Sequence, residues 1–268
     1  METSTKRRGE PGHDLGVSIE RHVATVTIRR PPNNHVDFRL LRDLRDALRE
    51  LDADQSCRAV VLAAEGKHFC AGADFAAGSM AAARSSDPSE ASSFYKMAAD
   101  LFRAKKPMVA AVQGAAIGAG LGLSLVADVR VTCSEARFSA NFTRLGFHPG
   151  FGLTHTLPRL IGPQKAALLF LTGRRISGDA ALAMGLADVL APQAEVLGRA
   201  QDLAQEIAGS APLAVVSTRT TLRQGLADAV ERATEREFVE QEWLCQTEDF
   251  QIGITAARTR DAPDFKGR

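Results

Sequence analysis

The chain has few residues of the kinds that make disulfide frameworks or metal sites. Its 268 residues include four cysteines, Cys57, Cys70, Cys133 and Cys245, with no C-x-x-C pair and no cluster of histidines around them. This spacing argues against a zinc site and against a small disulfide-stapled fold. We therefore expect free, buried thiols, as is usual in a reducing compartment, and a cytoplasmic location.

The chain also lacks an excess of charge and long apolar runs. Its 33 basic and 32 acidic residues leave a net charge of +1, too little to attract nucleic acid or an anionic membrane. No window reaches the ~20 consecutive apolar residues of a membrane span. The basic run at residues 6–8 lies in a polar segment interrupted by Gly9, Pro11 and Gly12, so we expect residues 1–14 to form a disordered tail. The sequence thus predicts a soluble protein.

Apolar residues, 45% of the chain, follow the pattern of an α/β protein. Two short alternating runs predict an opening hairpin, and apolar spacing of three and four residues predicts a helix at 37–51. Short β-branched runs separated by helical segments predict a mainly parallel sheet, whose functional loops lie at the carboxyl ends of its strands. The predicted strands are Val17–Glu20, Val23–Ile28, Ala59–Ala63, Met108–Val112 and Val129–Thr132.

The second half of the chain changes to consecutive helices. From Pro163 onward five segments show helical spacing, with Ser177 placed as an N-cap. We expect an α/β core at 15–205 and a C-terminal helical region at 206–268. The Ala-, Ser- and Gly-rich segment Gly78–Ser93 is interpreted either as a lid over a site or as a plain surface loop.

Two loops of small residues follow the strands expected at 59–63 and 108–112. The first is Gly66–Phe75 and the second is Gln113–Gly122. Small residues let backbone N–H groups approach a ligand closely. Two converging N–H groups are what a thioester carbonyl needs when negative charge develops on its oxygen. The pair of loops therefore predicts an oxyanion-binding site.

Other interpretations of the second loop remain. Gly118, Gly120 and Gly122 miss the dinucleotide-binding spacing G-x-G-x-x-G by one position, and the lysine of a phosphate-binding P-loop is absent. Ser124 lacks the second glycine of a nucleophile elbow, which makes a serine hydrolase a weaker alternative. Close helix packing is a structural explanation for each glycine motif taken alone.

Five segments resemble the enoyl-CoA hydratase/isomerase (crotonase) family, in the family's order along the chain. They are Phe69–Asp74, Val112–Gly120, Leu171–Ser177, Ala183–Asp188 and Ala262–Arg268. The resemblance implies a crotonase-like spiral β-β-α core and a helical C-terminal trimerisation region, hence a homotrimer or a hexamer. It also implies an acyl-CoA thioester as substrate, with no metal and no cofactor beyond the coenzyme A of the substrate itself.

The resemblance also implies particular site residues. The oxyanion-hole N–H groups correspond to those of Ala73 and Ala119, and Asp74 matches an acidic residue that usually fixes the first loop. The substrate-binding residues expected on this basis are Cys70, Ala71, Gly72, Asp74, Phe75, Gly118, Gly122, Phe142 and Phe151.

The sequence departs from the family at its acid positions. The two glutamates that hydratases of the family use correspond to Gly122 and Phe142, and the carboxylate of its isomerases corresponds to Gly150. Loss of a positioned acid or base lowers a rate by ~10²- to 10⁴-fold, so ordinary hydration should be nearly silent. Phe142 fits a dry acyl pocket better than a hydration site.

His148 is the titratable residue nearest to these positions. It is either an acid/base group or a turn histidine that hydrogen-bonds to backbone. His68 and Arg144 are expected to face solvent or coenzyme A phosphates, and Asn141 could orient a substrate or water.

The sequence as a whole predicts an atypical isomerase, hydratase or thioester hydrolase of acyl-CoA metabolism. The alternative is a non-catalytic acyl-CoA binding or carrier protein that kept the loops and lost the acids.

Overall fold

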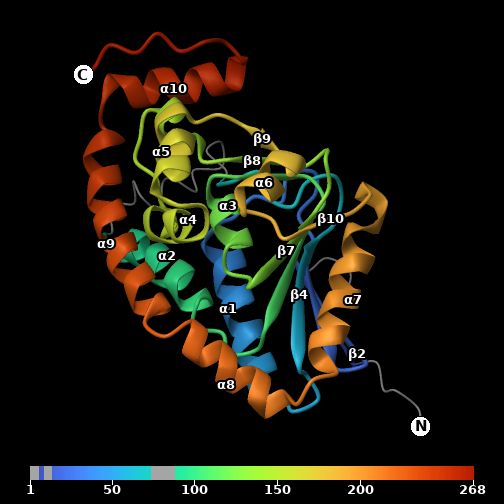
Figure 1. Ribbon diagram of the computed structural model, residues 1–268. Helices are drawn as coiled ribbons and strands as arrows, with labels where there is room; N and C mark the ends of the chain where they lie inside the picture. The colour runs from blue at the N-terminus through green and yellow to red at the C-terminus, as the bar shows by residue number, and fades with distance from the viewer. Residues whose placement is uncertain (1–5, 9–13, 74–87) are drawn as a thin grey trace.

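A seven-stranded sheet forms the centre of the protein (Figure 1). The structure, a computed structural model, describes residues 6–8, 14–73 and 88–268, with side chains for 14–73 and 94–268. The strands lie in the order β1-β2-β3-β4-β5-β7-β10, and from β3 onward all neighbours are parallel. Their bounds are β1 Lys6–Arg8, β2 Leu15–Glu20, β3 Val23–Ile28, β4 Ala59–Ala64, β5 Met108–Val112, β7 Val129–Thr132 and β10 Val189–Leu190. The predicted hairpin and parallel sheet are confirmed.

The first strand corrects the expectation of a disordered tail. Lys6–Arg8 pairs antiparallel with β2, with Lys6 opposite Ile19 and Arg8 opposite Val17. Backbone pairing at a sheet edge needs no apolar side chains, and charged residues are common on such edges. The basic run is therefore part of the sheet, while residues 1–5 and 9–13 lie outside the described residues.

A second, three-stranded sheet was not predicted. It consists of β6 Ala115–Ile117, β8 Arg137–Ser139 and β9 Ile176–Ser177, with β6 parallel to β8 and β8 antiparallel to β9. Strands of two or three residues leave no recognisable alternation in a sequence. This small sheet holds the second loop and the start of α3 (Ala119–Ser124) over the carboxyl end of β5.

Helices cover both faces of the large sheet. In order they are α1 Phe38–Ala53, α2 Pro88–Leu101, α4 Leu153–Ile161, α5 Pro163–Thr172, α6 Gly178–Met184, α7 Val196–Ala208, α8 Pro212–Leu222, α9 Leu226–Leu244 and α10 Glu248–Thr259, with 3₁₀ turns at Asn141–Leu145 and Gln193–Glu195. Ser177 caps α6 as predicted, accepting from the Ala180 N–H. None of the described helices is both long and apolar enough to cross a bilayer.

The expected lid falls partly outside the described residues. Of Gly78–Ser93, residues 78–87 are not described, and residues 88–93 begin α2.

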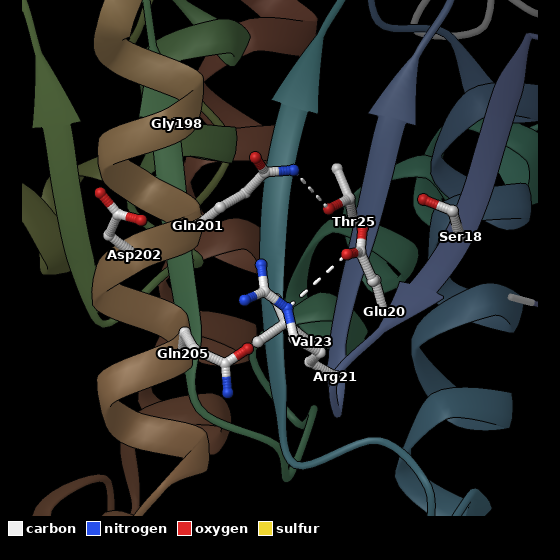
Figure 2. Close-up of a pocket in the computed structure, with 9 residues that line it drawn as sticks. All are labelled: Ser18, Glu20, Arg21, Val23, Thr25, Gly198, Gln201, Asp202 and Gln205. Carbon is white, nitrogen blue, oxygen red and sulfur yellow. Dashed lines mark hydrogen bonds and ion pairs between the residues drawn. The ribbon is translucent and has the colours of Figure 1, made fainter. Parts of the chain in front are cut away.

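Helix α7 packs on strands β3, β4, β5 and β7. Gln201 on this helix donates to the Thr25 hydroxyl at 3.2 Å across a polar pocket of ≈190 Å³ (Figure 2). The boundary expected after residue 205 therefore falls inside a helix that belongs to the core, so we place the C-terminal helical region after Ala208.

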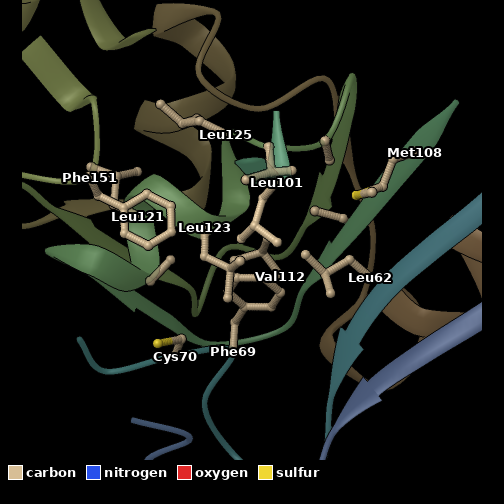
Figure 3. Close-up of a cluster of buried hydrophobic side chains, with 14 of the residues drawn as sticks. Leu62, Phe69, Cys70, Leu101, Met108, Val112, Leu121, Leu123, Leu125 and Phe151 are labelled. Carbon is tan, nitrogen blue, oxygen red and sulfur yellow. The ribbon is translucent and has the colours of Figure 1, made fainter. Parts of the chain in front are cut away.

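The apolar core includes the sheet and the inward faces of helices α1, α2, α3 and α7. Phe69, at the start of the first loop, is fully buried in a cluster with Leu62, Leu101 and Leu123 (Figure 3). This anchor fixes the loop at the carboxyl end of β4.

A buried ion cluster joins α8 to the amino ends of the strands. Asp128 accepts from the Met108 N–H at 2.8 Å, from Arg219 Nε at 2.7 Å and from Arg223 Nη1 at 2.6 Å. Burial alone would raise the pKa of Asp128, but the two guanidinium groups hold it below its ordinary value. The carboxylate is thus the negative partner of two cations with little exposure.

We predict that Asp128→Asn lowers the free energy of unfolding by about 3–5 kcal/mol, because it leaves two buried guanidinium groups without a counter-charge. Urea denaturation measures the change. Asp202→Asn, at an exposed position on α7, is the control and should stay within about 0.5 kcal/mol of the wild type. A loss below 1 kcal/mol for Asp128→Asn would contradict this account.

Candidate functional site

The two small-residue loops lie in direct backbone contact. The Cys70 N–H donates to Ala115 O at 2.8 Å, and the Ile117 N–H donates to Cys70 O at 3.0 Å, as in a short parallel ladder. The sequence placed the loops at the ends of two neighbouring strands, and the structure brings them together.

Two glycines make this close contact possible. A Cβ added at Gly114 would lie 2.0 Å from Lys67 O, and one at Gly120 would lie 2.1 Å from Cys70 O. Real Cβ atoms do not approach backbone oxygens so closely, so both positions require glycine. Close packing of the two loops therefore explains the glycines at these two positions, whatever role they also have in binding.

Ala73 and Ala119 each present a backbone N–H group without a partner among the described residues. Ala73 follows Gly72, which has φ +101° and whose carbonyl accepts from the Val36 N–H at 2.9 Å. Ala119 begins α3 after Gly118, whose φ is +54°. Both alanines are partly exposed. These N–H groups are free to bind an external acceptor.

The side chain of Asn34 holds the start of the first loop in place. It is fully buried, donates from Nδ2 to Glu65 O at 2.8 Å and to His68 O at 2.7 Å, and accepts the Arg30 N–H at 3.0 Å. Our sequence reasoning missed this residue. The signal was available in Pro31-Pro32-Asn33-Asn34, because asparagine after a proline turn commonly hydrogen-bonds to backbone.

The three expected acid positions are empty of acids and filled by other groups. A Cβ at Gly122 would meet the Phe151 ring at 2.6 Å, and one at Gly150 would meet Gln241 Nε2 at 2.7 Å. The Phe142 ring lies beside Gly118. The Phe147 ring packs edge-on against the Phe142 ring, with the two ring centroids 5.5 Å apart. Buried aromatic rings thus form much of the wall next to α3.

The turn that carries Gly150 and Phe151 is held by buried polar residues that the sequence did not reveal. Gln241 donates to His148 O at 2.7 Å and accepts the Tyr95 hydroxyl. Glu237, fully buried, accepts from the Gly152 and Thr154 N–H groups. Burial raises the pKa of Glu237 to about 7, against the opposing effect of these hydrogen bonds.

His148 borders a different cavity. Its Nδ1 lies 2.8 Å from Pro149 O, so Nδ1 carries the hydrogen of this bond. The cavity, ≈650 Å³, lies among α5, α9, α10 and the C-terminal segment, and no described residue of either loop is in its wall. His148 thus lies in the wall of this cavity, and its role as an acid/base group stays a prediction.

The remaining expected residues have varied surroundings. Cys70 is buried, and burial raises the pKa of its thiol to about 12, so it lines the loop as an unreactive group. Ser124 is buried with its hydroxyl donating to Leu121 O at 2.7 Å, which disfavours a serine nucleophile. The Nδ1 atom of His68 is buried without a partner among the described residues. Asp74 and Phe75 lie outside the described residues.

We predict that Gly120→Ala lowers the free energy of unfolding by about 2–3 kcal/mol, because its methyl group would force the two loops apart. Thermal or urea unfolding measures the loss. Gly198→Ala in α7 has nothing within 4 Å and should instead add about 0.5–1 kcal/mol. An equal response of the two variants would show that the loop contact is not tight.

Known proteins share the fold of this chain over nearly its whole length. The crystal structure of an enoyl-CoA hydratase/isomerase from Pseudoalteromonas atlantica T6c superposes with a TM-score of 0.84 at 29% identity, covering 95% of this chain and 100% of that one. A carnitinyl-CoA hydratase from Mycobacterium avium superposes with a TM-score of 0.82 at 30% identity, covering 95% and 99%.

Sequence comparison gives the same result. The 2,3-dehydroadipyl-CoA hydratase of Escherichia coli K12 is 34% identical over 258 residues, 95% of this chain and 99% of that protein. The family model described as enoyl-CoA hydratase/isomerase matches residues 18–268. The resemblance seen in the sequence is thereby confirmed: the chain belongs to the enoyl-CoA hydratase/isomerase family and is an enzyme of the crotonase superfamily.

Proposed function

We propose that this enzyme binds acyl-CoA thioesters with the thioester oxygen between the N–H groups of Ala73 and Ala119, and that it shifts a double bond in the acyl chain. The observation that carries the proposal is the pair of loops in backbone contact, each with an N–H group free of described partners. Two such donors stabilise the negative charge that the oxygen gains when a proton leaves the neighbouring carbon.

The surroundings of the site favour proton transfer over water addition. Hydration and thioester hydrolysis both consume a water molecule that must be positioned, whereas isomerisation adds no water and needs one group that takes a proton from one carbon of the acyl chain and returns it to another. The family's hydratases activate water from two positions, which in this chain are Gly122 and Phe142. The Phe151 ring covers Gly122. Aromatic rings offer water no hydrogen bonds, so this wall supports isomerisation.

The relatives support the substrate class. The hydratases from E. coli and M. avium are named for CoA thioesters with different acyl groups. The chain's four buried, free thiols fit a reducing cytoplasm. The apolar side chains of Leu171, Leu213 and Trp243 are exposed, which supports the burial of such surfaces in a homotrimer or hexamer.

We predict that a panel of 2-enoyl-, 3-enoyl- and saturated acyl-CoA thioesters will show a shifted double bond and little added water. Chromatographic separation of the isomers with mass spectrometry identifies each product. Hydration should be slower than in a typical relative by ~10²-fold or more, because both positioned glutamates are absent.

Three other outcomes would change the assignment. Hydration at the rate of ordinary relatives would contradict the interpretation of Gly122 and Phe142. Binding of thioesters with no conversion of any of them would overturn the proposed reaction and favour the carrier alternative. Release of free coenzyme A would identify a thioester hydrolase instead.

We further predict that His148→Ala keeps turnover within about threefold of the wild type, because neither described loop contributes to the cavity that His148 lines. Steady-state kinetics with the best substrate of the panel tests this. A loss of ~10²-fold or more would reinstate His148 as an acid/base group.

A further inference from the structure

The turn between the 3₁₀ segment Asn141–Leu145 and α4 has an unfavourable backbone. Phe151 and Gly152 are consecutive residues in the left-handed region, with φ values of +64° and +69°. Glycine adopts this conformation freely, but phenylalanine does so only where the surroundings hold it. Gly152 is also the N-cap of α4 and has no side chain with which to cap it.

Glu237 on α9 provides the missing cap. Its Oε2 accepts the Gly152 N–H at 2.7 Å, and its Oε1 accepts the Thr154 N–H at 2.9 Å and the Thr154 hydroxyl at 2.6 Å. The carboxylate is fully buried, and these groups are its hydrogen-bond donors. A backbone N–H group therefore faces each of the two oxygens, an arrangement that an amide cannot match on both sides.

A second clamp lies one helical turn further along α9. Gln241 is buried, donates to His148 O at 2.7 Å, and accepts the hydroxyl of Tyr95 from α2. Burial raises the pKa of Tyr95, which keeps the phenol neutral and able to donate. Residues 148–154 are thus fixed from both α9 and α2.

The position of this turn in turn fixes the position of α3. The Phe151 ring occupies the space in front of Gly122, which lies one turn after Ala119, and the Gly122 N–H donates to Gly118 O at 3.1 Å. Any shift of the turn moves this ring against the helix. The position of the Ala119 N–H therefore depends on contacts made by a residue more than a hundred positions later in the chain.

We propose that Glu237 is a positioning residue for the reaction: through the 148–154 turn and the Phe151 ring it holds α3 so that the Ala119 N–H points at the thioester oxygen. The inference rests on the proposed function of the two loops. It assigns helix α9 of the C-terminal region a part in the chemistry, in addition to its packing.

The test compares Glu237→Gln with the matched control Glu235→Gln, which changes an exposed glutamate on the same helix. Glu237→Gln puts an amide donor against an N–H donor and should release the turn. We expect kcat per folded enzyme to fall about 10- to 100-fold with KM within threefold, because the donor acts mainly on the charged transition state. Hydrogen exchange should accelerate at residues 118–124 as well as at 148–154.

A milder variant covers the case in which Glu237→Gln does not fold. Thr154→Val removes one of the three hydrogen bonds at nearly constant volume and should change kcat and exchange in the same direction, by a smaller factor. Glu235→Gln should behave as the wild type in both measurements.

Two results would overturn the inference. One is faster exchange confined to the turn and α4, with residues 118–124 unchanged, which is what a local helix cap alone would give. The other is an unaltered kcat in a variant whose turn has loosened. If the wild type converts no thioester, the proposed function fails and the role of Glu237 in a reaction fails with it, and faster exchange at 118–124 in Glu237→Gln then shows only that Glu237 holds α3.

Discussion

The arrangement of the site depends on one close contact between two backbones. Gly114 and Gly120 let the second loop approach Lys67 and Cys70 of the first until a methyl group would no longer fit. Hydrogen bonds between Cys70 and residues 115 and 117 then fix the register of the loops. With the two strands ending side by side and the loops paired, the N–H groups of Ala73 and Ala119 have no partner among the described residues. The proposed binding of the thioester oxygen thus depends on backbone geometry and not on a charged side chain.

The wall beside α3 has no acid at three positions, Gly122, Phe142 and Gly150. The Phe151 ring fills the space in front of Gly122, and the Gln241 and Tyr95 side chains fill the space in front of Gly150. Each of the two glycines is thus matched by a larger neighbour. A close-packed interior requires such matching, since both voids and overlaps destabilise it.

The sequence predicted the parts of the molecule that depend on local pattern. The hairpin, the parallel strands, the cap at Ser177 and the two loops all follow from residue spacing and side-chain type. It did not reveal the small sheet, whose strands are too short for any periodicity, or the basic edge strand at Lys6–Arg8. Glu237 and Gln241 also escaped notice, because on a long charged helix nothing in the sequence separates a buried carboxylate from its exposed neighbours. Their role depends on contacts with residues more than eighty positions away.

The contact between Gly122 and Phe151 couples what the two positions can hold. A glutamate at position 122 would overlap the aromatic ring at 151, and a small residue at both positions would leave a hole in a buried wall. A single substitution at either position therefore destabilises the protein, because one overfills the wall and the other leaves a void. Placing an acid beside α3 requires changes at both positions together.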